Sequence, residues 1–333
     1  MAPWRQFSIM LLAATAVLLT GFVALAYVID PYDTGRSPLF AKPGVRPQGP
    51  RTANASRGRD QAFNAMIVGN SHIQLVAPER LRKITGLDFV QLATPASGPK
   101  EHLTLIDWFL RNRLDEPKAL VIGIDDFWCI SDPKLPNDKP FPFWLYSADP
   151  LEYVEGLVRF DVLEELSRRI GYLFSASAER ARPDGYWDYE PEYIKLGYKT
   201  DPAFRQRLEQ KPYANAARYD RDPKLSERQF PAVARLRELA AKLPKETALL
   251  LVMPPVYINA LPPPGTEQAF QLNACKAAVM KVQGDHARTA VVDWLVDRPE
   301  IRVPELFFDA SHYRQPIAKA IEADIAEALR QVR

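Results

Sequence analysis

Five short apolar runs place the tightest limit on the fold of this chain. They are continuous rather than alternating, which is typical of strands buried on both faces of a parallel sheet. The runs are Ala65–Val68, Phe89–Ala93, Ala119–Ile124, Ala248–Met253 and Ala290–Val292. Segments with helical spacing of apolar residues follow at 100–113, 227–241, 267–283 and 315–331. This alternation predicts a three-layer α/β/α sandwich built on a mostly parallel sheet.

The chain is long enough for one large α/β domain with an insertion. It has 333 residues, and the interval 127–226 contains no apolar run that resembles a core strand. This interval is rich in aromatic residues, and we expect a largely helical insertion there. The formal net charge is only +2 and the basic residues are spread along the chain, so no nucleic-acid partner is expected.

Residues 1–30 are predicted to form a membrane anchor. The segment 7–29 carries no charge, and at about 1.5 Å per residue a helix of this length crosses a hydrocarbon core of about 30 Å. A cleaved signal peptide is the alternative, because residues 24–26 (Ala-Leu-Ala) resemble a cleavage site. We favour the anchor, since the apolar run is longer than a usual signal-peptide core.

The short tail before Arg5 favours a single-pass protein of the inner (cytoplasmic) membrane. Its main domain would then lie in the periplasm or another extracytoplasmic space. Residues 31–62 are rich in Pro, Gly, Arg and Ser, which predicts an extended linker. Residues 63–333 would form the α/β domain.

The chain has two cysteines, Cys129 and Cys275, and no Cys/His cluster. This pattern predicts no zinc site. We expect two separately buried thiols, and a disulfide in an oxidising compartment is the alternative.

Polar residues follow several of the predicted strands. Ligands of parallel α/β sheets bind beyond the carboxyl ends of the strands, so these residues are the first candidates for chemistry. The segments are GNSH at 69–72, TPASGP at 94–99, DD at 125–126 and, before the last helix, DASH at 309–312.

Asp309 and His312 have a spacing that lets a carboxylate accept a hydrogen bond from the imidazole. The other imidazole nitrogen would then face outward as a general base. Ser71, at the end of another strand, would complete a nucleophile, base and orienting carboxylate. The competing interpretation is that Ser71 caps a helix beginning near His72, and that Asp309 or Ser311 caps the last helix.

Taken together, these blocks resemble the SGNH hydrolase superfamily of GDSL-like esterases. The chain is more closely similar to the membrane-anchored envelope branch, which includes proteins of alginate acetylation and of teichoic acid D-alanylation. "VGNSH" matches the first block, with Ser71 as nucleophile, and "DASHY" matches the last block, with Asp309 and His312 completing the triad. The resemblance covers residues 63–130 and 245–333 and implies a flavodoxin-like SGNH fold.

The resemblance also implies an oxyanion hole that uses the backbone N–H groups of Ser71 and Gly98. The third block departs from the family pattern, because Asp125 stands where the family has an asparagine that donates to the oxyanion. An ionised carboxylate cannot donate a hydrogen bond. Three outcomes stay open: Asp125 points elsewhere, Asn70 substitutes as donor, or the oxyanion hole is weaker.

Asp125, Asp126 and Trp128 are candidate substrate-binding residues. We expect His72 to lie on a helix surface, and we assign no function to His102 or His286. The aromatic residues of the insertion are expected to form its own core, with one or two lining the crevice. They are Trp128, Trp144, Tyr146, Tyr186, Trp187, Tyr189, Tyr193 and Tyr198.

The expected function is serine-dependent transfer or hydrolysis of an O-acyl group, most simply acetyl, on an envelope polysaccharide or other extracytoplasmic glycan. The chemistry would need no metal and no organic cofactor. A membrane-bound protein would supply the acyl group in a transferase, and the N-terminal helix would hold the chain at the membrane. The alternative is a non-catalytic glycan-binding or assembly protein of the envelope on a degenerate SGNH fold, which Asp125 favours.

Overall fold

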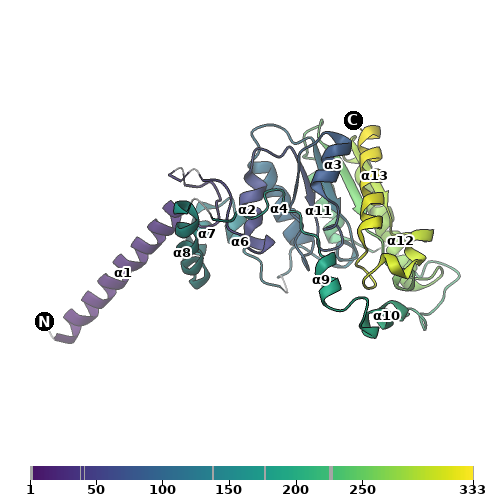
Figure 1. The fold of residues 1–333 in the computed structure, drawn as a ribbon, viewed down its shortest axis with the longest axis horizontal. Helices are drawn as coiled ribbons and strands as arrows, with labels where there is room; N and C mark the ends of the chain where they lie inside the picture. Colours follow the sequence, from purple (N-terminus) through teal and green to yellow (C-terminus); the bar gives the residue numbers. More distant parts are fainter. Residues whose placement is uncertain are drawn as a thin grey trace. The chain divides into compact units, whose positions relative to one another are not determined.

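The computed structural model divides the chain into two compact units (Figure 1). The anchor unit comprises Met1–Asp60 and Phe141–Pro183, and the sheet unit comprises Gln61–Pro140 and Asp184–Arg333. The structure describes residues 3–332 except 38, 41, 137–138, 176–177 and 225–227. Small parts of the predicted anchor, linker, insertion and helix 227–241 therefore lie outside the described residues.

The sheet unit is built on five parallel strands, as the apolar runs predict. All neighbouring strands pair in parallel, in the order β2-β1-β3-β4-β5. The strands are β1 Ala65–Val68, β2 Phe89–Gln91, β3 Ala119–Gly123, β4 Ala248–Met253 and β5 Thr289–Asp293. Every residue of β1 to β4 is buried, which explains why these strands read as continuous apolar runs.

Helices of the sheet unit pack on the strands through alternate side chains. Ala65 and Ile67 of β1 share one core cluster with Ile317, Ile321 and Ile325 of α13. Helix α13 contacts β4, β5 and α3, whereas α4 contacts β1 and α11. The α-helices are α3 Pro78–Thr85, α4 Pro99–Arg111, α5 Phe127–Ile130, α9 Glu190–Lys195, α10 Pro202–Glu209, α11 Pro231–Ala240, α12 Glu267–Met280 and α13 Gln315–Val332. Short 3₁₀ segments are η2 Ile258–Ala260, η3 Lys281–Gly284, η4 Pro299–Arg302 and η5 Pro304–Leu306.

The strand order creates a crevice where β1 and β3 end. The chain moves outward from β1 to β2, and then crosses back to place β3 on the other side of β1. Loops that leave the carboxyl ends of β1 and β3 therefore diverge, and this is where α/β sheets bind ligands. Ser71 follows β1 and Asp125 follows β3, so both lie at this point.

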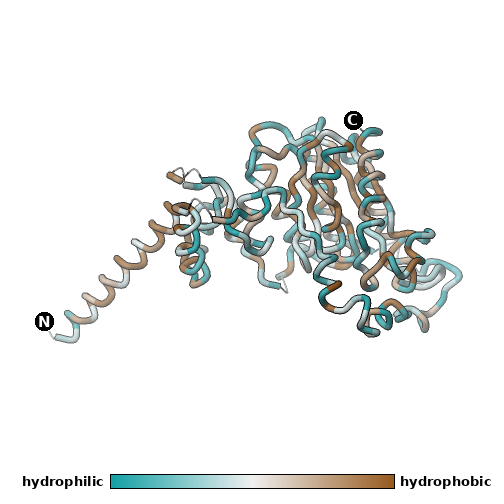
Figure 2. The backbone as a smooth tube through the Cα atoms, viewed as in Figure 1, coloured by the Kyte–Doolittle hydropathy of each residue, from teal (hydrophilic) through white to brown (hydrophobic). Residues whose placement is uncertain are grey.

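The anchor unit begins with α1 Pro3–Ile29, an apolar helix that is brown along most of its length in Figure 2. Only 6% of its most apolar stretch is buried, and the helix is long and apolar enough to cross a membrane. A signal sequence has the same properties, so both interpretations of residues 1–30 stay open. The other helices of this unit are α2 Pro50–Arg59, α6 Phe143–Tyr146, α7 Pro150–Gly156 and α8 Phe160–Phe174.

The predicted linker at 31–62 is not simply extended. It contains helix α2, and several of its polar side chains are buried in the anchor unit. The carboxylate of Asp33 accepts from the hydroxyl of Ser56 at 2.6 Å and from the N–H of Gly44 at 2.7 Å. Its proline- and glycine-rich composition concealed this packing, because the partners come from elsewhere in the linker and from the insertion.

The insertion at 127–226 contains no strand of the sheet in its described residues, as expected, but it does not form a single body. Its segment 141–183 belongs to the anchor unit, and the remainder belongs to the sheet unit.

A disulfide joins Cys129 of α5 to Cys275 of α12 across 146 residues of sequence. The expectation of two separate thiols is therefore wrong. Two half-cystines far apart in sequence have no local spacing that reveals their pairing, which only the packing of α5 near α12 decides. A disulfide that closes so long a loop stabilises a fold by roughly 2–4 kcal/mol.

Candidate active site

Ser71 lies in a turn after β1 and does not begin a helix. The N–H of His72 donates to the side-chain oxygen of Asn70 at 3.0 Å, which closes the turn. The next helix, α3, begins only at Pro78. The interpretation of Ser71 as a helix cap is therefore wrong.

Gly69 allows the chain to turn sharply before Ser71. Its φ is +155°, and a Cβ at this position would lie 2.8 Å from Cγ2 of Ile73 and 3.4 Å from Cα of Gly123. A side chain here would push apart the ends of β1 and β3. Gly69 thus fixes Ser71 at the edge of the sheet.

The three predicted catalytic residues meet in one hydrogen-bonded chain. Oγ of Ser71 lies 2.9 Å from Nε2 of His312, and Nδ1 of His312 lies 2.9 Å from each carboxylate oxygen of Asp309. When Nδ1 carries its proton toward Asp309, Nε2 is free to accept the proton of Ser71. This is the geometry of a nucleophile, a general base and an orienting carboxylate.

The carboxylate of Asp309 is held in its ionised form. Burial alone would raise its pKa, but His312 and the N–H groups of Ser311 and His312 lower the pKa well below the ordinary value. The two N–H groups donate to Oδ1 at 3.0 Å and 2.9 Å, and the hydroxyl of Tyr193 donates to Oδ2 at 3.1 Å. Asp309 is thus a fixed acceptor at neutral pH, and its alternative role as a helix cap is not observed, since its partners precede α13.

Two tyrosines enclose the imidazole of His312. The rings of Tyr189 and Tyr193 both lie 5.6 Å from it, centroid to centroid. Tyr189 also donates from its hydroxyl to the backbone oxygen of Tyr313 at 2.8 Å, which locks this wall in place. Both tyrosines are among the eight aromatic residues that the sequence indicated, but their position beside His312 could not be predicted, because they lie in the insertion more than 100 residues away from it.

The three predicted oxyanion donors differ in whether a group of the protein already accepts their hydrogen bond. No acceptor in the described part of the chain takes the N–H of Ser71, so it is available for a substrate oxygen. The N–H of Gly98 instead donates to Oε2 of Glu101 at 3.1 Å, within the cap of α4. The side-chain amide of Asn70 donates to Asp125 and, at 3.4 Å, to the backbone oxygen of Ser97. Gly98 and Asn70 are therefore not free donors in this structure, which corrects their predicted role.

His72 forms a second histidine–aspartate pair with Asp125. Its Nδ1 lies 3.3 Å from Oδ2 of Asp125, and its ring lies 5.4 Å from that of His312. Partial burial lowers its pKa, but the hydrogen bond and charge of Asp125, with Asp126 and Asp309, raise it above the ordinary value. The predicted helix-surface role is wrong, because no helix begins here and the side chain is turned into the crevice.

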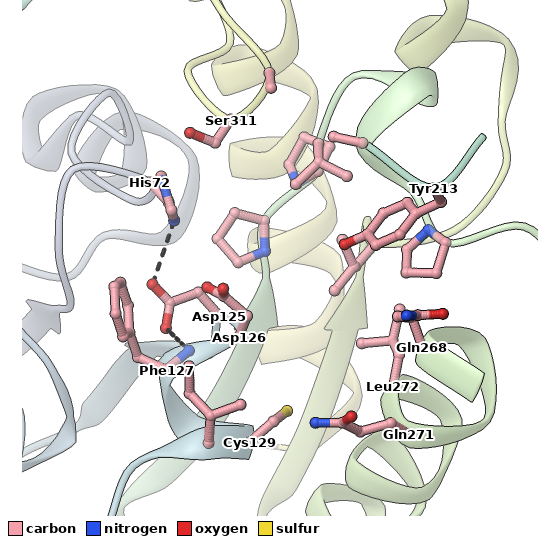
Figure 3. Close-up of a pocket in the computed structure, with 18 residues that line it drawn as sticks. His72, Asp125, Asp126, Phe127, Cys129, Tyr213, Gln268, Gln271, Leu272 and Ser311 are labelled. Carbon is pink, nitrogen blue, oxygen red and sulfur yellow. Dashed lines mark hydrogen bonds and ion pairs between the residues drawn. The ribbon is translucent and has the colours of Figure 1, made fainter. Parts of the chain in front are cut away.

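Asp125 is also oriented by the start of α5. Its Oδ1 accepts from the N–H of Phe127 at 3.2 Å, while Oδ2 faces His72 (Figure 3). The side-chain amide of Asn70 also donates to Oδ2. Of the three open outcomes for this residue, the structure supports the one in which Asp125 points elsewhere. Its carboxylate fastens the loop after β3 to the turn after β1.

A cavity of about 530 Å³ opens beside this pair (Figure 3). Asp125 and Asp126, the candidate substrate-binding residues, line it together with His72 and Ser311. Much of the remaining wall is apolar, including Pro254, Pro255 and Leu272, and a few polar groups interrupt it. Those groups are Tyr213, Gln268 and Gln271.

Trp128 does not line the cavity. It is fully buried, and its indole N–H donates to the backbone oxygen of Gly123 at 3.1 Å. Its predicted role in substrate binding is therefore wrong. Its ring packs near His102, with the two ring centroids 5.9 Å apart.

The remaining aromatic residues of the insertion mostly pack, as expected. Tyr189 belongs to the main core cluster, Tyr193 and Tyr198 pack against it, and Trp144 and Tyr146 are buried in the anchor unit. None of the eight singled out lines the cavity, whereas Tyr213 does. Tyr213 stands alone in a polar stretch, so no sequence signal marked it.

His102 and His286 are buried structural histidines. Nε2 of His286 lies 2.7 Å from the backbone oxygen of Thr247. The hydroxyl of Ser97 donates to the oxygen of Thr94 at 2.6 Å, so Nε2–H of His102 must donate to that hydroxyl at 2.9 Å. Burial lowers the pKa of His102 to about 4, and this imidazole is neutral at physiological pH.

Among the residues that the structure describes, no group of three or more His, Cys, Asp or Glu side chains is placed to hold a metal ion. Comparison of the chain with models of known protein families and with curated protein sequences found no match. Function must therefore be argued from the geometry of the site.

Proposed function

We propose that this chain is an SGNH-type serine enzyme that transfers or hydrolyses an O-acyl group on an extracytoplasmic glycan. The observation that carries the proposal is the hydrogen-bonded chain from Ser71 through His312 to Asp309. Each of the three residues comes from a loop at the carboxyl edge of the sheet, where such sites are built. The strand order β2-β1-β3-β4-β5 is that of flavodoxin-like folds and supports a three-layer SGNH architecture.

In the first half-reaction, Oγ of Ser71 attacks the acyl carbonyl carbon while its proton passes to Nε2 of His312. The tetrahedral intermediate then expels the oxygen of the acyl donor, which takes the proton back from His312. An ester on Ser71 remains. Asp309 stabilises the imidazolium that forms between these two proton transfers.

In the second half-reaction, His312 removes a proton from a sugar hydroxyl or from water. That oxygen attacks the carbonyl of the acyl-serine, and the Ser71 oxygen leaves with the proton from His312. A transferase and a hydrolase differ only in which oxygen reaches the ester. The cavity beside Ser311 and His72 is the place where an acceptor would enter.

The oxyanion would be bound chiefly by the N–H of Ser71. Removing one donor from an oxyanion hole commonly costs about 10²–10³-fold in rate. With Gly98 and Asn70 engaged elsewhere, we expect slow turnover of simple esters. Slow chemistry is compatible with an acyl transferase that works beside a dedicated donor protein.

Two features of the chain support a site outside the cytoplasm. The helix α1 is suited to a membrane, and the Cys129–Cys275 disulfide is of the kind that persists in oxidising compartments. We therefore propose a single-pass protein of the inner membrane with its sheet unit in the periplasm or an equivalent space. The acyl donor would come from a membrane-bound protein and the acceptor would be an envelope polysaccharide or other glycan.

A non-catalytic glycan-binding or assembly protein is the second candidate. It is favoured by Asp125, which replaces an oxyanion donor with a carboxylate and fastens two loops together. In this case the cavity would bind a glycan without reacting with it.

The deciding experiment uses the full-length protein in lipid nanodiscs with p-nitrophenyl acetate. Nitrophenol release and intact protein mass are recorded for the wild type and for Ser71→Ala and His312→Ala. We expect the wild type alone to gain one acetyl group, mapped to Ser71. An added neutral oligosaccharide that accelerates loss of this acetyl group would identify a transferase.

The catalytic proposal fails if the wild type carries no acyl adduct and releases nitrophenol at the same rate as both variants. Binding of oligosaccharides to the unreacted protein would then favour the second candidate.

A further inference from the structure

Helix α8 of the anchor unit presents a mostly apolar stripe that the described part of the chain leaves largely exposed. Phe160 is 82% exposed, Leu163 51% and Phe174 74%, whereas Val162 and Leu166 on the opposite side are buried. At about 100° per residue, positions 160, 163, 167, 170, 171 and 174 fall within one narrow face of the helix. We call these six residues (Phe, Leu, Ser, Ile, Gly and Phe) the α8 stripe.

The α8 stripe is not the result of a loosely attached helix. On the buried side, Arg169 donates to the backbone oxygens of Gly44 and, at 3.1 Å, Lys42. The hydroxyl of Tyr172 donates to the backbone oxygen of Pro43 at 3.0 Å. These bonds fix the rotation of α8 about its axis, so the exposure of the stripe is a property of the folded unit.

Ser167, the one polar side chain of the stripe, makes its hydrogen bond within α8. The hydroxyl of Ser167 donates to the backbone oxygen of Glu164 at 2.8 Å, within the helix. The charged residues of α8 lie beside the stripe rather than in it, with Glu164 and Arg168 paired along one border. Such a face, apolar with charged borders, is typical of helices that lie in the interface of a membrane.

The stripe continues the lipid-compatible surface of α1. Helices α1 and α8 are in contact, and Figure 1 shows α8 beside the C-terminal end of α1. Phe22 of α1 lines one groove with Val158, Phe160 and Leu163, and Val23 and Tyr27 line another with Val154 and Val158. Arg159 also lines the first groove, so the surface between the two helices is apolar with one basic residue.

The depth of this contact can be estimated along α1. Phe22 lies seven residues before Ile29, where α1 ends, which corresponds to about 10 Å of helix. Interfacial helices bury their apolar face about 5–10 Å into the boundary between headgroups and acyl chains. Phe160, at the level of Phe22, therefore lies within reach of the acyl chains if α1 crosses the bilayer.

We propose that α8 lies in the lipid–water interface of the membrane that α1 enters, with Phe160, Leu163, Ile170 and Phe174 against the acyl chains. The occupant of the stripe is lipid rather than a protein partner. The consequence is that the anchor unit is a membrane-embedded platform, held at a fixed depth and orientation, and not a tether. This inference depends on retention of α1 and is independent of the proposed catalysis.

The test uses single-cysteine variants of the full-length protein in nanodiscs that contain only phosphatidylcholine. Both native cysteines are in the disulfide, so a thiol-reactive fluorophore labels only an introduced cysteine. Leu163→Cys and Phe174→Cys probe the stripe, Leu18→Cys in α1 reports the bilayer, and Asp161→Cys on α8 is the matched aqueous control. Each label is exposed in turn to a nitroxide-bearing lipid and to iodide in the buffer.

We expect the labels at 163 and 174 to lose fluorescence to the nitroxide lipid as the label at 18 does, and to resist iodide. The label at 161 should show the reverse. The proposal is overturned if the labels at 163 and 174 behave like that at 161 while the label at 18 is in lipid, because the stripe would then await a protein. It is also overturned if the label at 18 is itself accessible to iodide. Two independent stripe positions keep the result interpretable if one variant folds poorly.

Discussion

Two histidine–aspartate pairs face each other across the crevice, and they have different structural roles. Asp309 presents both carboxylate oxygens to Nδ1 of His312, whose other nitrogen contacts Ser71. Asp125 presents one oxygen to His72 at 3.3 Å, and it also accepts hydrogen bonds from the side-chain amide of Asn70 and from the N–H of Phe127 at the start of α5. One carboxylate orients a base, and the other ties two loops together. A histidine beside an aspartate is thus a candidate base only when its second nitrogen has something to deprotonate.

The largest expected effect separates the two histidines by catalysis. His312→Ala should lower the rate of serine acylation by about 10⁴-fold, because it removes the base of the triad. His72→Ala should lower it by only about tenfold, the cost of losing one hydrogen-bonded group near the site. Both rates follow from the nitrophenol burst under single-turnover conditions. Equal losses in the two variants would mean that His72 takes part in proton transfer.

His102 extends the comparison to a buried histidine without a carboxylate at hydrogen-bond distance. Its pKa of about 4 lies below the unfolded value, so acid favours the unfolded chain as pH falls from about 6.5 to about 4. The free energy of unfolding should fall by on the order of 3 kcal/mol across this window, at about 1.4 kcal/mol per pKa unit. Urea unfolding of the wild type and of His102→Gln at several pH values measures the difference.

The shifted pKa values of Asp309 and His72 affect the stability of the fold in other pH ranges. Because the pKa of Asp309 is lowered, its carboxylate stabilises the fold at any pH above the ordinary carboxylate pKa. This contribution is lost as pH falls from that ordinary pKa toward the lowered one. Because the pKa of His72 is raised, its protonated imidazole stabilises the fold at any pH below the ordinary imidazole pKa. This contribution is lost as pH rises through the raised pKa.

For the prediction on His102, the contradicting outcome is a His102→Gln variant that unfolds with the same pH dependence as the wild type. His102 would then not be held neutral in the fold.

The pairing of His72 can be tested directly through its titration. Asp125→Asn should lower the pKa of His72, since the hydrogen bond and charge of Asp125 are the main causes that raise it. Asp309→Asn should lower it less, because Asp309 contributes only a more distant charge. The chain has four histidines, so NMR of the imidazole protons can be assigned by substitution. An unchanged pKa in Asp125→Asn would show that the pair does not form in solution.

The smallest effect concerns the support of Asp309. Tyr193→Phe removes the hydrogen bond to Oδ2 of Asp309 but leaves His312 and two backbone N–H groups in place. We expect a rate decrease of about two- to tenfold, the typical worth of one hydrogen bond. Tyr198→Phe is the matched control, because the ring of Tyr198 packs on Phe308 in the same cluster. Equal rates for wild type and Tyr193→Phe would assign Tyr193 to packing alone.

Much of the fold and the triad was predictable, because the relevant signals are local. A strand buried on both faces must be apolar at every position, so β1 and β4 have the bounds that their apolar runs predict. Asp309 and His312 lie three residues apart in one short loop, so their pairing can be predicted from the local sequence. Ser71 follows a strand end, and parallel topology brings strand ends to a common edge.

Most of the incorrect predictions concern groups whose partners are distant in sequence. Asn70 has the expected residue type, but Asp125, 55 residues away, engages its side-chain amide. Gly98 is an exception, because its N–H is engaged by Glu101, only three residues away. The linker is rich in proline and glycine, which predicted an extended segment. The buried carboxylate of Asp33 nevertheless accepts hydrogen bonds from the N–H of Gly44 and the hydroxyl of Ser56. The composition of a segment indicates the local structure that it favours, but it does not indicate which hydrogen-bond partners other segments supply in the folded chain.

The sequence by itself therefore determined the parallel sheet, the apolar N-terminal helix and the three residues of the hydrogen-bonded chain. Only the tertiary structure decided that Asp125 holds His72, that Cys129 joins Cys275 and that Tyr193 supports Asp309, across 53, 146 and 116 residues. The physical reason is that burial and backbone pairing impose periodic patterns on neighbouring residues. A side-chain contact between distant segments imposes no pattern, because any acceptor of suitable reach can satisfy a donor once the fold brings them together.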